Sequence, residues 1–159
     1  MRTYTVIDSP LGLLTLTAED SVLSGVYLEK RPSELGRRQD EGFDEAIRQF
    51  GEYFAGERTT FDLPTLASGN NLQFGVWQAL SEIPYGETRS YGQIADQLGL
   101  RHVVRAVGAA IGQNPLLVVV PCHRVIGADG KLTGYAGGLE RKRQLLDLER
   151  PAPVAGRLF

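Results

Sequence analysis

The chain has 159 residues, of which 42% are hydrophobic and 23% charged, so one folded domain or two small ones are expected and wholesale disorder is excluded. No apolar run approaches the roughly 20 residues that span a bilayer, and the N-terminus lacks the apolar stretch of a secretory signal. One cysteine cannot form an internal disulfide, so a cytoplasmic protein is expected. Residues 1–69 hold 7 Lys and Arg against 12 Asp and Glu, whereas residues 70–159 hold 10 against 7. This split permits polyanion contact on one side only, although charge alone favours an ordinary solvated surface.

The beginning of the chain predicts a small antiparallel sheet. Thr3–Ile7 and Leu13–Thr17 alternate apolar and polar residues, which is typical of strands with one buried face. Ser9–Gly12 contains Pro and Gly and predicts a tight turn between them. Val22–Leu28 predicts a third strand, and the charged segment Lys30–Asp40 predicts a mobile connection.

A helix follows the predicted sheet. Apolar side chains recur at spacings of three and four, which indicates an amphipathic helix: Phe43, Ile47, Phe50 and Phe54. Gly56 is placed to end it. Asp62–Asn71 is rich in Pro, Gly, Ser and Asn, which indicates a linker and predicts two domains, residues 1–69 and 70–159.

The second domain is predicted to be mostly helical. Leu72–Ile83 predicts a helix, and Ser90 is a good N-cap for the next one, Tyr91–Leu98. A short turn leads into His102–Ile111, so the pair has the pattern of a helix-turn-helix. After the glycine-rich loop 127–138, Leu139–Glu149 predicts a charged terminal helix.

The sole cysteine follows a predicted strand. Leu116–Val120 is apolar and rich in β-branched residues, which predicts a buried strand, and Pro121 would end its pairing because proline donates no ladder hydrogen bond. Cys122 and His123 are therefore expected at a strand end that faces a cleft.

Cys122 and His123 form a candidate nucleophile and base. A free cysteine is usually a small buried hydrophobe, but a thiol with a pKa of roughly 8.5 becomes a nucleophile when a base takes its proton. Neighbouring residues of a strand point in opposite directions, so His123 reaches Cys122 only if the backbone turns after Pro121 or water bridges them. The base needs an orienting group, usually a carboxylate, and spacing alone selects none.

Pro121-Cys122-His123-Arg124-Val125 resembles the active-site motif of the O6-alkylguanine-DNA alkyltransferases, or methylated-DNA–protein-cysteine methyltransferases. Further matches surround it in order: Ile83-Pro84-Tyr85-Gly86, Ser90-Tyr91, Arg105-Ala106-Val107-Gly108, Asn114-Pro115, Gly134-Tyr135 and Gly137-Gly138. The resemblance runs from about Trp77 to Glu149, whereas the N-terminal part matches only in its strand–turn–strand opening and one helix. It implies an α/β, ribonuclease-H-like N-terminal domain with an antiparallel sheet plus a helix, followed by a mostly α, winged-helix-like C-terminal domain.

The resemblance also implies a role for each catalytic candidate. Cys122 would irreversibly accept the alkyl group of O6-alkylguanine, and of O4-alkylthymine, in double-stranded DNA. His123 would take the thiol proton through a water, and Glu149 would orient the imidazole. Tyr91 would donate a hydrogen bond to the guanine, which makes the base a better leaving group. Asn114 would brace the turn before the active-site segment.

The helix at His102–Gly112 has a single Arg and many small residues, which favours close approach to a groove without sequence readout. A base inside a duplex is out of reach of a buried thiol, so it must be flipped out. The resemblance places this helix in the minor groove, with Arg105 filling the vacated stack. The other expected contacts are DNA contacts at Val103, Val104, Ala106 and Gly108, and pocket residues at Ile111, Leu117, Val125, Tyr135 and Ala136.

Some positions depart from the family pattern. Val103 and Val104 stand where small alanines are common, Leu117 where some members have a second proline, and Ala136 where others have serine. Leu72–Gly75 departs from a usual Phe-Gln-rich stretch. One Cys and two His are too few for the zinc site of some relatives, so no metal or cofactor is expected. The expected partner is alkylated duplex DNA and not a membrane, with a monomer that could cluster on DNA.

Three other functions were weighed. Relatives that only sense lesions lack the acceptor cysteine, so Cys122 counts against a non-catalytic binding protein. A transcription regulator would carry base-reading side chains on residues 102–112, where they are scarce. A cysteine hydrolase is disfavoured because adjacent residues rarely form such a dyad.

Overall fold

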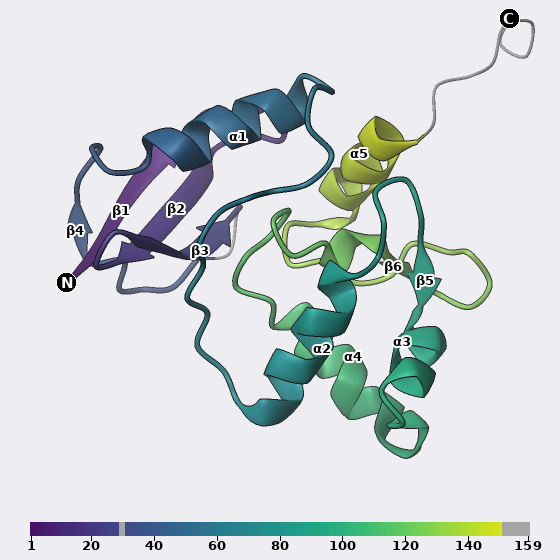
Figure 1. Ribbon diagram of the computed structural model, residues 1–159. Coiled ribbons are helices and arrows are strands. Elements are labelled where there is room, and N and C mark those ends of the chain that lie inside the picture. Colours follow the sequence, from purple (N-terminus) through teal and green to yellow (C-terminus); the bar gives the residue numbers. More distant parts are fainter. Residues whose placement is uncertain (29–30, 151–159) are drawn as a thin grey trace, which may run out of the picture.

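The chain folds into a sheet-based N-terminal part and a helical C-terminal part (Figure 1). The computed structural model describes residues 1–28 and 31–150. The N-terminal elements are β1 (Arg2–Ile7), β2 (Leu14–Glu19), β3 (Val22–Tyr27), β4 (Arg37–Arg38) and α1 (Asp44–Phe54). The C-terminal elements are α2 (Asn71–Ser81), β5 (Arg89–Ser90), α3 (Tyr91–Gln97), the 3-10 helix η1 (Arg101–Val103), α4 (Val104–Gly112), the 3-10 helix η2 (Cys122–Arg124), β6 (Val125–Ile126) and α5 (Leu139–Glu149). Among the described residues, no helix has the length and apolar character needed to cross a membrane.

The three predicted strands form the centre of the N-terminal sheet, whose order is β3-β2-β1-β4. β1 and β2 pair in antiparallel register from Arg2 opposite Glu19 to Ile7 opposite Leu14. Asp20 and Ser21 join β2 to β3, and both have positive φ (49° and 72°), as a two-residue hairpin turn requires. The three predicted strands are confirmed, but β2 is buried at every residue from Leu14 to Ala18 and not on the single face that its alternation predicted.

The sheet also contains a strand that the sequence pattern did not predict. β4 pairs in parallel with β1, Thr3 opposite Arg37, so the sheet is mixed rather than purely antiparallel and part of the supposed mobile connection is a strand. Gly36 has a φ of +87°, and a Cβ there would lie 2.3 Å from the Arg2 carbonyl oxygen. A residue without a side chain therefore lets this segment approach the edge of β1.

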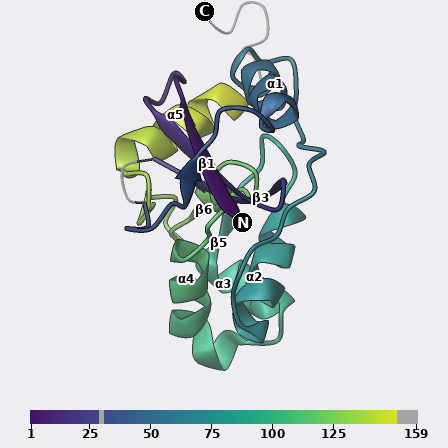
Figure 2. The ribbon, with the colours of Figure 1, turned by 90° about the vertical axis from the view of Figure 1, so that its left-hand side faces the viewer.

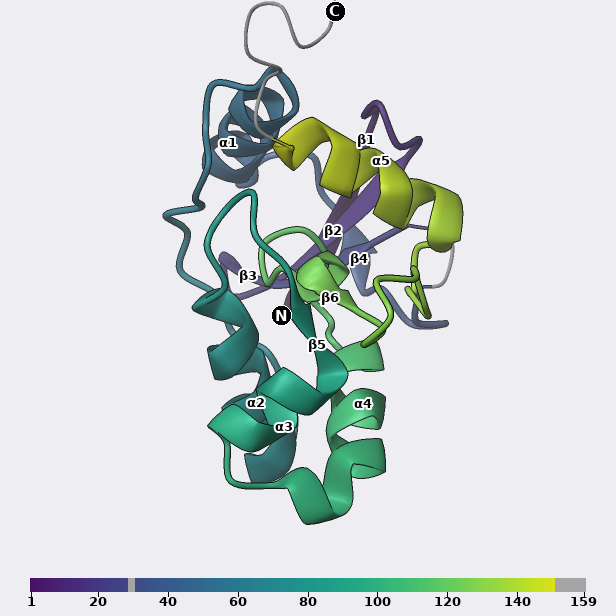
Figure 3. The same cartoon turned by 90° about the vertical axis from the view of Figure 1, so that its right-hand side faces the viewer.

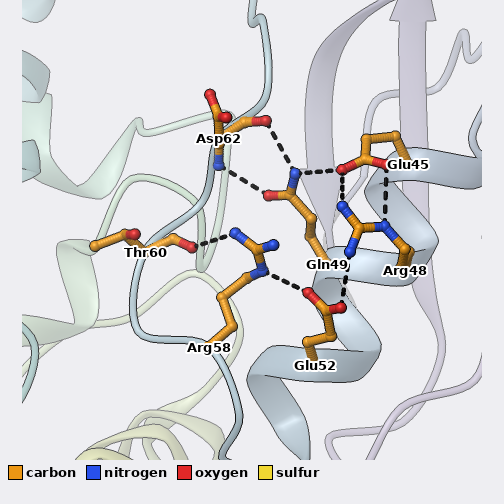
Figure 4. Close-up of polar contacts among 7 residues, drawn as sticks. All are labelled: Glu45, Arg48, Gln49, Glu52, Arg58, Thr60 and Asp62. Carbon is orange, nitrogen blue, oxygen red and sulfur yellow. Dashed lines mark hydrogen bonds and ion pairs between the residues drawn. The ribbon is translucent and has the colours of Figure 1, made fainter.

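α1 buries most of the apolar stripe that its spacing predicts, because Phe43 and Phe50 are at most 3% exposed and Phe54 packs against the core. Ile47 is 36% exposed, whereas Gln49 and Tyr53 are buried beside Phe50. The Gln49 amide donates to the Asp62 carbonyl (2.9 Å) and accepts from the Asp62 amide (2.8 Å), so this polar side chain is buried without an unpaired group (Figure 4).

The segment after α1 is tied back to the helix by a row of polar side chains (Figure 4). Arg48 bridges Glu45 and Glu52, which lie one turn away on either side. Arg58 donates to Glu52 (2.8 Å) and to the Thr60 carbonyl (3.0 Å), so the chain leaving α1 folds back along it.

The helix-turn-helix is built from strong local signals. Ser90 caps α3 by accepting from the Gln93 amide, and Gln93 returns a bond to the Ser90 amide, as a capping box requires. Gly99 follows α3 with a φ of +71°. The second helix, α4, begins two residues later than predicted, because Arg101–Val103 form the separate 3-10 turn η1.

Leu116–Val120 is not a strand, contrary to the sequence prediction. The segment makes isolated bridges near its two ends, and Val118 has a φ of +74°. The Asn114 side chain accepts from the Leu116 amide (2.9 Å) and donates to the Val120 carbonyl (2.9 Å), which closes the segment into a turn. An apolar run predicts burial but does not distinguish a buried strand from a buried turn.

The edge strand β3 joins the two parts of the molecule. The Leu66 amide donates to the Leu23 carbonyl (2.8 Å), so the predicted linker runs along the sheet. On the same strand the Val26 amide donates to the Pro115 carbonyl (2.8 Å), and the Val26 carbonyl accepts from Leu117 (3.3 Å). The turn that precedes Cys122 is thereby anchored to the N-terminal sheet.

α5 has the predicted bounds, but its place in the molecule could not be predicted from them. Figures 2 and 3 show it beside α1 and the sheet, at the opposite end of the molecule from α3 and α4. Near its start, Arg141 donates to the Leu11 carbonyl (2.7 Å) in the turn between β1 and β2. The last helix of the chain therefore lies at the junction of the two parts.

Candidate active site

The backbone turns directly after Pro121, which meets the condition that the sequence set for Cys122 and His123. Cys122–Arg124 form the 3-10 helix η2, in which successive side chains are separated by about 120°. Cys122 is 5% exposed and His123 is fully buried. The pair is therefore not held on opposite faces of a strand.

Glu149 is the carboxylate that meets His123. The imidazole Nε2 lies 2.8 Å from Glu149 Oε2, although the two residues are 26 positions apart. Burial lowers the pKa of His123, and the hydrogen bond and charge of Glu149 only partly reverse this effect. The imidazole is consequently neutral at neutral pH and can accept a proton.

Two groups that the sequence analysis did not single out complete the surroundings of Glu149. Arg124 donates to both carboxylate oxygens, Nε to Oε1 (2.7 Å) and Nη2 to Oε2 (3.0 Å). The Tyr53 hydroxyl donates to Oε2 from α1. Burial raises the pKa of Glu149, but the bonds from His123, Arg124 and Tyr53 outweigh this and lower it to about 2. The carboxylate is therefore ionised at neutral pH.

The thiol of Cys122 is protonated in the resting protein. Burial raises its pKa to about 11, while contact with Asn114 and the charge of Lys142 act in the opposite direction. Because few thiolates exist at neutral pH, nucleophilic attack by this sulfur requires that its proton be removed during the reaction.

Lys142 is a further buried charge that sequence reasoning missed. Its ammonium donates to the carbonyls of Thr133 and Gly134, and burial lowers its pKa to about 8. Lys142 shares the buried face of α5 with Leu145 and Glu149. The spacing of these three residues, three and then four positions, indicates a shared face of the helix. A lysine on a buried face is unusual, so this pattern could have identified Lys142 from the sequence.

Tyr91 and the glycine-rich loop lie next to each other. Tyr91 is half-buried at the start of α3, and its hydroxyl accepts a hydrogen bond from the Thr133 hydroxyl (3.0 Å). A Cβ on Gly108 of α4 would lie 3.8 Å from the Tyr91 ring. The tyrosine is thus set between α4 and the loop that Lys142 holds.

Two buried polar atoms close to the thiol lack a hydrogen-bond partner among the described residues: His123 Nδ1 and the Tyr135 hydroxyl. The Tyr135 ring meets the His123 ring edge-on, with centroids 6.5 Å apart. Unpaired buried polar atoms are uncommon in folded proteins, so this region is suited to a polar group that arrives from outside.

The end of η1 and the start of α4 present apolar residues and one arginine to the surface. Arg105 and Ala106 are exposed, Val103 is 37% exposed, and Val104 and Gly108 are half-buried. In the part of the chain that the structure describes, Arg105 forms no ion pair. Its side chain is therefore available to a partner.

The predicted pocket residues separate into two groups. Ile111, Leu117 and Val125 are at most 4% exposed and belong to the hydrophobic core. Tyr135 and Ala136 are half-buried on the loop beside α5. Among residues 1–28 and 31–150, no three His, Cys, Asp or Glu side chains gather as a metal site would require.

Both parts of the chain match known families. Residues 3–67 match the ribonuclease-like domain of 6-O-methylguanine DNA methyltransferase, and residues 71–151 match the DNA-binding domain of the same enzyme. The methylated-DNA–protein-cysteine methyltransferase of Mycolicibacterium paratuberculosis is 53% identical over 100% of this chain and 99% of its own length. That of Mycobacterium tuberculosis is 52% identical over 98% of each chain.

Solved structures agree with this result. The crystal structure of the Mycobacterium tuberculosis O6-methylguanine methyltransferase superposes with a TM-score of 0.89 at 50% identity, covering 100% of this chain and 99% of that one. The same organism's protein in complex with DNA has a TM-score of 0.88 at 52% identity, covering 94% and 96%.

The fold and the site together define a two-domain, DNA-binding methyltransferase of the kind that repairs DNA by direct reversal. The chain belongs to the 6-O-methylguanine DNA methyltransferase family.

Proposed function

We propose that this chain transfers the alkyl group of O6-alkylguanine in double-stranded DNA irreversibly to Cys122, and that O4-alkylthymine is a second substrate. The observation that carries the assignment is the arrangement of one thiol, a neutral imidazole and an ionised carboxylate, with His123 Nε2 2.8 Å from Glu149. Direct-reversal repair is the activity of the family, and the thiol is the only one in the chain.

The proposed alkyl transfer needs no cofactor, because the protein and the DNA base supply every bond and proton of the step. The sulfur of Cys122 attacks the alkyl carbon, the S–C bond forms and the C–O6 bond breaks, and its electron pair stays on the guanine. The thiol proton passes through a water to His123 Nδ1, the buried nitrogen that lacks a partner among described residues. A proton returns to the leaving base, so guanine and a thioether are the products. A thioether offers no easy leaving group, so each molecule acts once.

Proton transfer is required because the resting thiol has a pKa of about 11. His123 is available to accept the proton because its lowered pKa keeps the imidazole neutral, and Glu149 stabilises the imidazolium that forms. Lys142 adds a positive charge that favours the developing thiolate.

Tyr91 is proposed to hydrogen-bond the departing guanine, which stabilises the negative charge on the leaving base. Its hydroxyl already contacts Thr133, so it lies against the loop that also carries Tyr135 and Ala136. Ile111, Leu117 and Val125 belong to the core, and we propose that they form the floor of this pocket. Asn114 maintains the turn through its bonds to residues 116 and 120.

The burial of Cys122 supports base flipping, because a thiol that is 5% exposed cannot reach a base inside a duplex. We propose that α4 enters the minor groove and that Arg105 fills the gap left by the flipped base. Val103, Val104, Ala106 and Gly108 are proposed to lie against the groove; the two valines make this surface bulkier than alanines would.

We further propose that the domain boundary lies between residues 69 and 70, and that the C-terminal domain, with α3, α4 and the short β5–β6 pair, is winged-helix-like. The N-terminal domain is proposed to be of the ribonuclease-H type, with β4 added to its antiparallel strands. We propose that the protein is a cytoplasmic monomer that acts on alkylated duplexes. Measuring how many molecules bind one duplex tests whether it clusters on DNA.

The assignment is tested by incubating the protein with a duplex that contains one O6-methylguanine and measuring both the remaining lesion and the mass of the intact protein. Wild type is expected to lose the lesion while gaining one methyl group. Cys122→Ala is expected to bind the same duplex without changing it. A lesion that survives wild type although the complex forms would contradict the proposal and support a lesion sensor.

A further inference from the structure

A side chain of the N-terminal domain, Tyr53, reaches into the proposed active site. Tyr53 lies in α1 and is 1% exposed. Its hydroxyl donates a hydrogen bond to Glu149 Oε2, the oxygen that also contacts His123. The two residues are 96 positions apart. Burial raises the pKa of Tyr53 well above its usual value, so the hydroxyl stays protonated and acts only as a donor.

The ring of Tyr53 is held in a cluster of aromatic side chains. Its centroid lies 5.3 Å from those of Phe54 and Phe61 and 6.3 Å from that of Tyr85. These contacts fix the ring, so the hydroxyl has little freedom to leave Glu149. The hydrogen bond is therefore a constraint on the carboxylate rather than an occasional contact.

Glu149 needs such a constraint because it is the last residue of α5, and helix ends fray. The N-terminal part holds this helix at both ends (Figure 3). Near its start, Arg141 donates to the Leu11 carbonyl (2.7 Å) and to the Gly137 carbonyl (3.0 Å). At its end, Tyr53 holds Glu149 itself.

We propose that Tyr53 is a positioning residue for alkyl transfer: it fixes the Glu149 carboxylate against His123, so the N-terminal domain forms part of the active site. The inference rests on the proposed function of Cys122, His123 and Glu149. Tyr53 acts through Glu149, and no direct contact with the substrate is invoked.

The titratable and charged groups that face the His123–Glu149 pair come from several elements: Arg124 from η2, Cys122 beside it, Lys142 from α5, Tyr53 from α1, Tyr85 before β5 and Tyr135 from the loop. Of these, Tyr53 and Arg124 donate to the oxygen that His123 uses. Removing the Tyr53 donor makes Oε2 a stronger acceptor for His123, which raises the pKa of the imidazole.

The test is Tyr53→Phe in the full chain, with the reaction of Cys122 followed by protein mass after mixing with free O6-methylguanine base across a range of pH. The variant keeps the ring and loses the donor. The plateau rate is expected to fall by about tenfold. The lost hydrogen bond to the charged Glu149 no longer holds this carboxylate against His123. The pH at which the rate is half its plateau is expected to rise.

Tyr85→Phe is the matched control. Its ring lies in the same cluster, but its hydroxyl donates to the Leu148 carbonyl (3.3 Å) rather than to Glu149. Its plateau rate and half-plateau pH are expected to equal those of wild type. Equal rate losses in both variants with no movement of the half-plateau pH would mean that Tyr53 only packs, and would overturn the proposal.

Two further measurements do not depend on the stability of Tyr53→Phe. A fluorinated tyrosine at position 53 keeps the shape and is a stronger donor, so the half-plateau pH should move downward; no movement overturns the proposal. In a Glu149→Gln background, Tyr53→Phe should have no additional effect on the rate, and an undiminished effect overturns it. If wild type itself fails to alkylate Cys122, the proposed function fails instead, so the two failures are distinguishable.

Discussion

A buried thiol and a buried imidazole are matched in their protonation states. The pKa of Cys122 is raised to about 11 and that of His123 is lowered, both chiefly by burial, so at neutral pH the proton is on sulfur and the base is free. Burial therefore keeps the resting thiol protonated and unreactive, and it also keeps His123 neutral, so that the imidazole can accept a proton. Reaction then depends on a substrate that makes proton removal and attack simultaneous.

This arrangement predicts a distinctive pH dependence for the reaction of Cys122 with free O6-methylguanine base. The rate should fall as the pH drops through the lowered pKa of His123, because the imidazole becomes protonated, and stay level above it. In His123→Asn the level region should disappear, and the rate should rise by about tenfold per pH unit towards the pKa of the thiol. Both profiles are measured by stopping the reaction at set times and determining the alkylated fraction from the protein mass.

His102→Asn is the control, because His102 is the second histidine of the chain and is exposed. Its profile with the free base should match wild type. A wild-type rate that keeps rising without a level region would show that free thiolate, and not a thiol–imidazole pair, reacts.

At this scale the residues alone indicated Cys122 and His123 as a candidate pair, whereas Glu149 entered only through the family resemblance, because spacing selected no carboxylate. The sequence could not predict Tyr53, whose partner is 96 residues away and whose position looks like core. A single chain carries no local signal for a hydrogen bond between two domains.

Among the elements, α4 carries the proposed contacts with DNA, and η2 carries the proposed chemistry. Arg105 is exposed on α4 and forms no ion pair with the described residues, whereas Cys122 is buried in η2. A change at Arg105 should therefore affect only substrates that must be extracted from a duplex.

Arg105→Ala is expected to slow repair of a duplex by about ten- to a hundredfold, because unstacking a base costs a few kcal/mol that the inserted side chain helps to offset. The rate with free O6-methylguanine base should change by less than about twofold. Arg143→Ala, which removes another exposed arginine from α5, should leave both rates unchanged. Parallel losses on duplex and free base would contradict the role given to Arg105.

Elements with strong local signals were predictable. α5 has the predicted bounds, and Ser90 caps α3 as expected. The strand predicted at Leu116–Val120 is a turn, because its apolar residues are buried by the fold and the Asn114 side chain satisfies the backbone. β4 is two residues long and depends on Gly36 lying against β1, which no period-two pattern reveals.

At the scale of the whole molecule, the junction of the domains and the active site are the same place. Glu149 ends α5 and receives bonds from η2 and from α1, while the turn before Cys122 pairs with the edge strand β3. The sequence predicted two domains but not this arrangement, since linker composition says nothing about how domains pack.

Acid should therefore weaken the whole fold through Glu149. Its folded-state pKa is about 2 against an ordinary 4.5, so its contribution is complete above about 4.5 and is lost as the pH falls through about 2. Urea unfolding across this range should show falling stability in wild type. In Glu149→Gln this pH dependence should disappear. The free energy of unfolding at neutral pH should fall by about 3–5 kcal/mol, because Arg124 is left buried without its partner.

Glu45→Gln is a matched comparison, since the pKa of Glu45 is also lowered to about 2, by the side-chain bond from Arg48, but the pair is exposed to solvent. Screening by water should make its effect on the pH dependence much smaller. An equal effect of the two substitutions would show that Glu149 is not a buried junction.

The central claim is that a single sulfur accepts one alkyl group and is then spent. It is tested most directly by treating the protein with an excess of duplex containing O6-methylguanine, digesting it, and weighing the peptide that contains Cys122. The account predicts one added methyl on that peptide in every molecule, an equal amount of restored guanine, and no reaction with a second portion of duplex. Continued loss of lesion after all protein is modified, or repair that leaves the Cys122 peptide unchanged, would contradict it.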